Sequence, residues 1–184
     1  MKITGENEVP ATKEEVWQAL NDPDVLAKCI PGCESLERVG ENSFKATVTN
    51  RIGPVTAKFD GKVDLTDLDP PNGYTLMGSG SAGSMGNAKG AAKVSLTETE
   101  TGTKLSYDVD VEITGKIAQL GGRLIQSTAN VLAGQFFKKL ARVIGEETGA
   151  EMPAEAAAGP NWVKWGLVLV AGVAVAAIAY FILG

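Results

Sequence analysis

Residues 55–65 read V-T-A-K-F-D-G-K-V-D-L, with an apolar residue or glycine at every second position. Successive side chains of a β-strand point to opposite faces of its sheet, so this alternation predicts a strand with one buried face and one face in water. Half-buried strands of this kind are typical of antiparallel sheets. The segment therefore predicts an antiparallel sheet with one apolar face in the middle of the chain.

More strands are predicted on both sides of this segment, separated by turn sequences such as Gly53-Pro54 and Thr101-Gly102. They lie at residues 2–9, 44–49, 74–84, 88–97 and 105–113. Most are short and follow one another directly, as they do in antiparallel sheets built from hairpins.

Helical patterns flank the strands. Thr12 and Glu15 form a capping-box sequence before a short helix, and residues 24–29 predict a second short helix or turn. At residues 117–144 the apolar period becomes helical, with an interruption at Gly121-Gly122. This order predicts an α+β helix-grip fold, in which a curved antiparallel sheet wraps around a long C-terminal helix.

The inward face of the predicted sheet carries unusually small residues. They are Ala46, Ala57, Gly61, Gly78, Gly80, Ala82 and Ala92. We interpret them as leaving an internal apolar cavity, although the glycines could instead mark bulges and strong twist. The expected walls of the cavity, and its ligand-binding residues, are Phe59, Leu76, Tyr107, Val109, Leu124, Leu132 and Phe136. Tyr107 and Asn50 are the polar groups best placed to meet a ligand, unless backbone groups satisfy them.

The composition argues against several kinds of chemistry. The chain has no histidine, which excludes Ser-His-Asp and Cys-His nucleophile pairs and His-ligated metals. Two cysteines, Cys29 and Cys33, are too few for a zinc or iron–sulfur site. Residues 78–83 match G-x-G-x-x-G, but a strand rather than a helix follows, so they do not predict a dinucleotide site. We therefore predict no catalytic residue, no metal ligand and no covalently bound cofactor.

The charge and the last part of the sequence predict where the protein works. A net charge of −5 disfavours nucleic acid as a partner. Residues 165–184 carry no charge and are long enough for a transmembrane helix. We expect three parts: a helix-grip domain at 1–148, a flexible linker at 149–161 and a single C-terminal transmembrane helix, the tail anchor, at 162–184. The expected location is the cytoplasmic membrane, crossed once, with the domain facing the cytoplasm.

Several short segments together resemble a known family. They are Leu20-Asn21-Asp22-Pro23, Cys29-Ile30-Pro31-Gly32-Cys33-Glu34, Ile52-Gly53-Pro54-Val55, Phe59-Asp60-Gly61, Gly115-Lys116-Ile117-Ala118-Gln119-Leu120-Gly121 and Phe136-Phe137. Over about residues 2–145 the chain resembles the CoxG family of carbon monoxide dehydrogenase subunits. This family belongs to the START-like, or SRPBCC, helix-grip superfamily, which agrees with the pattern of strands and helices.

The resemblance implies an accessory protein rather than an enzyme. It implies recruitment of a molybdenum-containing carbon monoxide dehydrogenase, or a related molybdenum hydroxylase, to the cytoplasmic membrane. Our hypothesis adds that the cavity binds a quinone, menaquinone or ubiquinone, which links the enzyme to the respiratory chain. The alternative is a carrier of lipid or another apolar ligand unrelated to a dehydrogenase. Residues 29–33 and 51–54 could dock the partner, or could simply fix turns.

Overall fold

A computed structural model describes residues 1–148 of the chain. The strands are β1 (Lys2–Val9), β2 (Cys33–Gly40), β3 (Ser43–Ile52), β4 (Val55–Asp69), β5 (Gly73–Ser81), β6 (Asn87–Thr99) and β7 (Gly102–Ile113). The helices are α1 (Lys13–Asn21), α2 (Pro23–Cys29) and α3 (Gly122–Thr148), with short 3₁₀ turns η1 (Gly83–Met85) and η2 (Ala118–Leu120).

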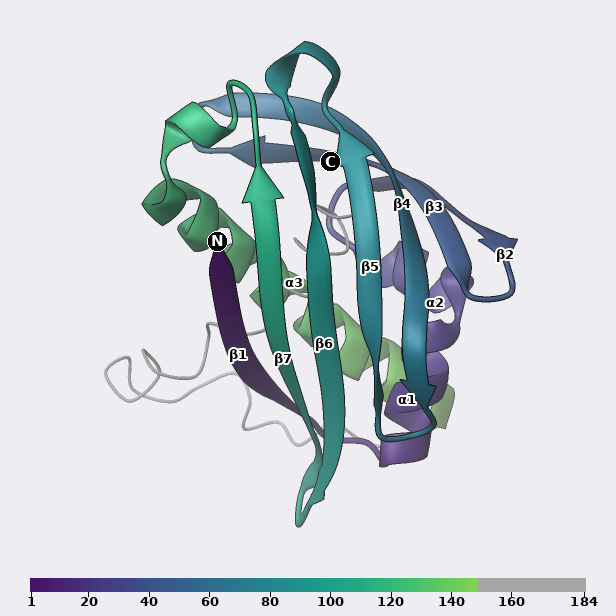
Figure 1. The fold of residues 1–184 in the computed structure, drawn as a ribbon. Coiled ribbons are helices and arrows are strands. Elements are labelled where there is room, and N and C mark those ends of the chain that lie inside the picture. The colour runs from purple at the N-terminus through teal and green to yellow at the C-terminus, as the bar shows by residue number, and fades with distance from the viewer. Residues whose placement is uncertain (149–184) are drawn as a thin grey trace.

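The seven strands form one antiparallel sheet in the order β1-β7-β6-β5-β4-β3-β2. Figure 1 shows this sheet curving around α3, while α1 and α2 lie on the same concave side near the lower end of β4 and β5. Each central strand follows its neighbour through a hairpin, so nearly all pairing is between consecutive strands. This is the helix-grip arrangement that the sequence predicts.

The alternation at residues 55–65 forms the first part of β4. Ala57, Phe59 and Val63 are buried on the concave face, whereas Lys58 and Asp60 are exposed on the convex face. The strand continues beyond the predicted end to Asp69, so β4 is the longest strand in the described part of the chain. Its length lets β4 pair with β3 on one side and β5 on the other.

The long C-terminal helix fills the concave face. Phe136 and Leu140 are fully buried, and the rings of Phe136 and Phe137 pack edge to face with their centroids 5.0 Å apart. The predicted interruption is a real break, because Gly121 has a φ of 87° and separates η2 from α3. The helix predicted at residues 117–144 is therefore a 3₁₀ turn followed by a helix that begins at Gly122.

The two short helices are fixed by their caps. The Thr12 hydroxyl accepts a hydrogen bond from the Glu15 amide at 3.3 Å, and the Glu15 carboxylate accepts one from the Thr12 amide at 2.8 Å. This confirms the predicted capping box. Asp22 then ends α1 and caps α2, with its carboxylate accepting from the Asp24 amide at 2.8 Å. The shared residue holds α1 and α2 at a sharp corner over the sheet.

The predicted fold class needs a correction in its last element. No helix within residues 1–148 is both long enough and apolar enough to cross a membrane. The longest of them, α3, carries charged residues such as Lys138, Lys139 and Arg142 along its outer surface. On this finding we withdraw the transmembrane helix and the single-pass location in the cytoplasmic membrane. The segments on which they rested, 149–161 and 162–184, lie outside the described residues.

A substitution in α3 tests the central packing. Phe136→Ala removes a fully buried ring and is expected to lower the free energy of unfolding by about 3–5 kcal/mol. Val131→Ala, on the exposed side of the same helix, is the matched control and should change it by less than about 0.5 kcal/mol. Urea unfolding followed by circular dichroism measures both. Equal losses would mean that α3 does not hold the sheet through this face.

Candidate functional site

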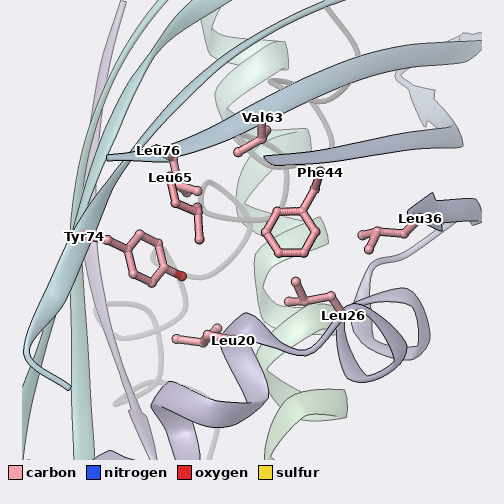
Figure 2. A pocket seen from close by; sticks show the side chains of 8 residues that line it. All are labelled: Leu20, Leu26, Leu36, Phe44, Val63, Leu65, Tyr74 and Leu76. Atoms are coloured by element: carbon pink, nitrogen blue, oxygen red, sulfur yellow. The ribbon is translucent and has the colours of Figure 1, made fainter. Parts of the chain in front are cut away.

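An apolar cavity lies between the two short helices and the concave face of the sheet. Its volume is about 20 Å³. Figure 2 shows the side chains that converge on it from α1, α2 and strands β2 to β5. They are Leu20, Leu26, Leu36, Phe44, Val63, Leu65, Tyr74 and Leu76.

Strand register brings the sheet side of this cavity together. Phe44 pairs with Val63 across β3 and β4, and Leu65 pairs with Leu76 across β4 and β5. All four side chains point to the concave face, because each lies at an inward position of its strand. The corner between α1 and α2 then covers them.

Tyr74 supplies the polar group of this otherwise apolar site. The residue is 4% exposed, and its ring packs edge to face on Trp17 with the centroids 5.5 Å apart. Figure 2 shows its hydroxyl directed into the cavity. Burial raises the pKa of Tyr74 well above that of a free tyrosine, so the group stays a neutral hydrogen-bond donor.

The size of the cavity limits what it holds in this conformation. A volume of about 20 Å³ is room for roughly one water molecule. Pockets that enclose a drug-sized ligand have volumes of about 300–1,000 Å³. A larger ligand would therefore require α1 and α2 to move away from the sheet.

Of the seven ligand-binding residues predicted from sequence, Leu76 lines this cavity. Val109 lies in the same cross-strand row, because Ala92 pairs with both Leu76 and Val109. Phe59, Tyr107 and Phe136 are buried elsewhere in the core, and Leu124 and Leu132 are half-buried on α3. Contact of these residues with a ligand stays a prediction.

Sequence reasoning missed Tyr74, although a signal for it was present. Tyr74 and Leu76 are two residues apart in β5, so they share the concave face. The alternation could identify that face, but it could not show that α1 and α2 close over this end of the sheet. The helix residues of the site, Leu20 and Leu26, depend on the same tertiary contact.

The small residues of the concave face stand side by side. In the register of the sheet, Ala46 pairs with Gly61, Gly61 with Gly80, and Gly80 with Ala88. The strands pair without a register shift at these positions, which argues against bulges as the reason for the glycines. The concave face therefore carries little side-chain volume along a row that crosses four strands.

The loop at residues 30–33 is fixed by contacts with β3. Asn50 donates its side-chain amide to the Pro31 carbonyl at 3.1 Å, and the Thr49 amide donates to the Gly32 carbonyl at 2.9 Å. Gly32 has a φ of 76°, and a Cβ there would lie 2.1 Å from the Thr49 carbonyl oxygen. Asn50, expected as a ligand-binding candidate, is thus satisfied by backbone.

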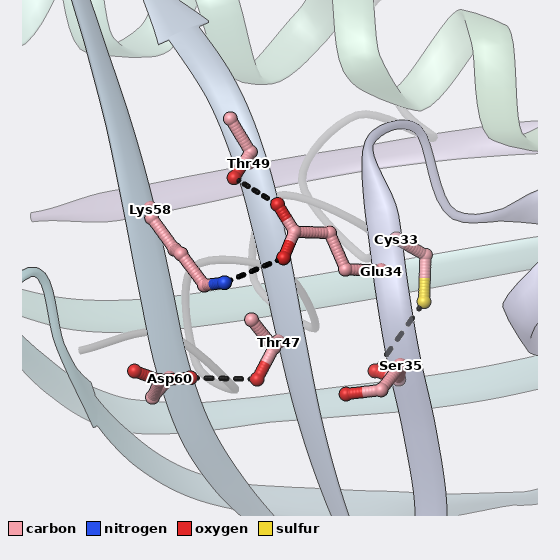
Figure 3. Close-up of polar contacts among 7 residues, drawn as sticks. All are labelled: Cys33, Glu34, Ser35, Thr47, Thr49, Lys58 and Asp60. Atoms are coloured by element: carbon pink, nitrogen blue, oxygen red, sulfur yellow. Dashed lines mark hydrogen bonds and ion pairs between the residues drawn. The ribbon is translucent and has the colours of Figure 1, made fainter.

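Polar contacts follow this loop on the convex face (Figure 3). The Glu34 carboxylate accepts hydrogen bonds from Lys58 and Thr49, each at 2.6 Å, and these contacts lower its pKa. Cys33 is half-buried, and burial raises the pKa of its thiol, which keeps it a weak nucleophile. Cys29 and Cys33 form no disulfide within the described residues, and no group of three potential metal ligands occurs in the part of the chain that the structure describes.

The sheet curved around α3 and its apolar interior define a helix-grip domain. The chain belongs to the CoxG family of carbon monoxide dehydrogenase subunits, whose family model matches residues 5–145. The predicted family is therefore confirmed. A search of curated proteins gave no match.

Solved structures of similar proteins agree with this assignment. A conserved protein from Geobacillus kaustophilus shares 36% sequence identity over 80% of this chain and 97% of its own, with a TM-score of 0.75. Ara h 8.0201 shares 19% identity over 79% of this chain and 98% of its own, with a TM-score of 0.56. Protein Ms6760 from Mycobacterium smegmatis shares 16% identity over 79% and 92%, with a TM-score of 0.61. The latter two show the fold alone.

A glycine pair tests the role of the loop at residues 30–33. Gly32→Ala adds a Cβ against the Thr49 carbonyl and should cost about 3 kcal/mol or more of unfolding free energy. Gly83→Ala is the control, because Gly83 also has a positive φ but open space around it, and should cost about 1 kcal/mol. Thermal and urea unfolding measure the difference. Similar losses would show that the contact with β3 does not fix the loop.

The buried phenol predicts a specific dependence on pH. Above about pH 10 an unfolded tyrosine loses its proton, while Tyr74 in the folded protein keeps it. The unfolded state then binds fewer protons, so the free energy of unfolding falls by up to about 1.4 kcal/mol per pH unit until the raised pKa is reached. Tyr74→Phe should lack this part of the loss.

Urea unfolding of both proteins at pH 8, 10 and 11 measures the effect. Parallel curves for the wild type and the variant would contradict the burial of a neutral phenol at this position.

Proposed function

We propose that this chain is an accessory protein of a molybdenum-containing carbon monoxide dehydrogenase, or of a related molybdenum hydroxylase. In this role it docks the enzyme and binds an apolar ligand, a quinone, under α1 and α2. Membership of the CoxG family supports the association with the dehydrogenase. The expectation that the chain is not itself an enzyme remains a prediction, supported by the family's description as a subunit.

The observation that carries the ligand part is the Tyr74 hydroxyl. It is a buried donor, directed into a cavity whose other lining residues are aliphatic or phenylalanine. A hydroxyl directed into an apolar cavity can donate a hydrogen bond to an acceptor, so a ligand that brings an acceptor there gains more than apolar contact alone. A quinone fits this chemistry, because its apolar ring carries carbonyl oxygens that accept hydrogen bonds.

The same chemistry fits the reaction of the partner enzyme. Oxidation of carbon monoxide with water to carbon dioxide releases two electrons and two protons. A quinone takes up two electrons and two protons to become a quinol. An accessory protein that holds a quinone next to the enzyme would therefore supply its electron acceptor. The residues of this chain bind and orient that acceptor, with Tyr74 at one carbonyl.

Binding requires the cavity to widen from about 20 Å³. The parts that would have to move are α1 and α2, because their residues Leu20 and Leu26 close the cavity. Movement of this corner would join the cavity to the row of small residues at Ala46, Gly61 and Gly80. We therefore expect the ligand to enter between α2 and the sheet.

A pair of tyrosine variants tests the ligand site. Tyr74→Phe should weaken binding of a short-chain menaquinone by about threefold to tenfold, the effect of one lost hydrogen bond. Tyr107→Phe is the control for the residue that the sequence favoured, and should leave the affinity unchanged. Isothermal titration calorimetry on the full chain measures both.

The opposite order of effects would place the ligand elsewhere in the core. Organic extraction of the full chain purified from its own cells gives a second measurement. An extract without quinone, together with no binding of the added analogue, would contradict the ligand proposal. An extract rich in another lipid would favour a carrier unrelated to a dehydrogenase.

A further inference from the structure

A basic groove lies between α2 and α3, on the outer side of the helices. Its volume is about 470 Å³, and it is lined by Lys28, Lys139, Arg142, Val143 and Glu146. Lys28 stands in the last turn of α2, while the other four come from one stretch of α3. From this arrangement we infer that the groove docks an acidic segment of the partner enzyme. This inference rests on the proposed function.

The charge of the groove is opposite to that of the chain. Three cations and one carboxylate line it, whereas the whole chain carries a net charge of −5. An acidic protein that concentrates cations in one concave place directs an anionic partner to that place. The remaining surface repels the same partner and so suppresses other orientations of docking.

The cations of the groove are mostly available to a partner. Arg142 contacts Glu146 at 3.4 Å, with both side chains 68% exposed. Lys28 and Lys139 are exposed and form no ion pair with another residue in the described range 1–148. By contrast, Lys58 and Lys62 on the convex face each contact a carboxylate within 3.0 Å. The groove cations thus differ from these two paired lysines of the sheet.

The shape of the groove favours a stretch of polypeptide. Lys139 and Arg142 are three residues apart, so they lie on one side of α3, facing Lys28 across the groove. Val143 gives the groove an apolar surface between these charges. A hollow of about 470 Å³ is far larger than a single phosphate or carboxylate, and matches a segment with acidic and apolar residues.

The position of the groove links docking to the ligand cavity. Helix α2 contributes Leu26 to the cavity and Lys28 to the groove. An occupant of the groove therefore contacts the same seven-residue helix that closes the cavity. A partner bound here would sit beside the entrance that we propose for the ligand.

Charge reversal tests the groove. Lys139→Glu combined with Arg142→Glu should weaken binding of the carbon monoxide dehydrogenase from the same cells by about tenfold or more. Lys45→Glu combined with Lys93→Glu makes the same change in net charge on exposed convex-face residues, and should have less than about a threefold effect. Biolayer interferometry at low and high salt measures binding of the enzyme to the immobilised full-length wild type and to both double variants. Thermal melting checks that each protein is folded.

A third variant gives an effect of the opposite sign. Glu146→Gln removes the one carboxylate of the groove and releases Arg142, so it should bind the enzyme at least as tightly as the wild type. A loss of binding by this variant would contradict attraction of an acidic segment.

The outcomes separate the docking site from the proposed function. If the wild-type chain does not bind the enzyme at all, the proposed function fails. If it binds and both double variants bind equally well, the groove inference is overturned and the function stands. Vesicles containing phosphatidylglycerol are the second probe. If binding to these vesicles depends on Lys139 and Arg142 while binding to the enzyme does not, the groove binds lipid instead.

Glu151 and Glu155 of the same chain could compete with the enzyme for the groove, and a further double variant tests this. Glu151→Gln combined with Glu155→Gln should bind the enzyme as the wild type does. A gain of about tenfold would instead mean that this acidic stretch occupies the groove.

Discussion

The packing of α3 into the concave face of the sheet is the constraint on which the rest of the structure depends. Phe136 and Leu140 are fully buried there, and their burial requires the strands against which α3 packs to keep one apolar face inward. The sheet extends beyond the reach of this helix, and α1 and α2 cover the remaining end. Leu20 and Leu26 do not fill that end completely, which leaves the cavity beside Tyr74. The candidate site therefore forms where the cover of the sheet changes from α3 to α1 and α2.

Much of this fold follows from local sequence. The alternation at residues 55–65 forms β4, and the capping box forms the start of α1. Sequence reasoning did not find β2, because most of its residues are exposed and an edge strand lacks the alternation that burial imposes. It named Leu76 but missed Tyr74 on the same face, since the corner between α1 and α2 that closes the site is a tertiary feature. The family, in contrast, could be recognised from short segments, because their turns impose particular residues such as Gly32.

Helix α2 connects the cavity and the groove. Its inner side contributes Leu26 to an apolar cavity, and its end contributes Lys28 to a basic groove. Asp22 fixes its start against α1, and the loop at residues 30–33 fixes its end against β3. The helix is thus held at both ends and borders both the cavity and the groove.

The central claim is that a buried tyrosine makes this end of the helix-grip domain a ligand site. A crystal structure of the full chain grown with a short-chain menaquinone tests it most directly. The account predicts the quinone ring between α2 and strands β4 and β5, with one carbonyl oxygen within hydrogen-bond distance of the Tyr74 hydroxyl. A ring bound instead among Phe59, Tyr107 and Leu132, with Tyr74 untouched, would contradict it.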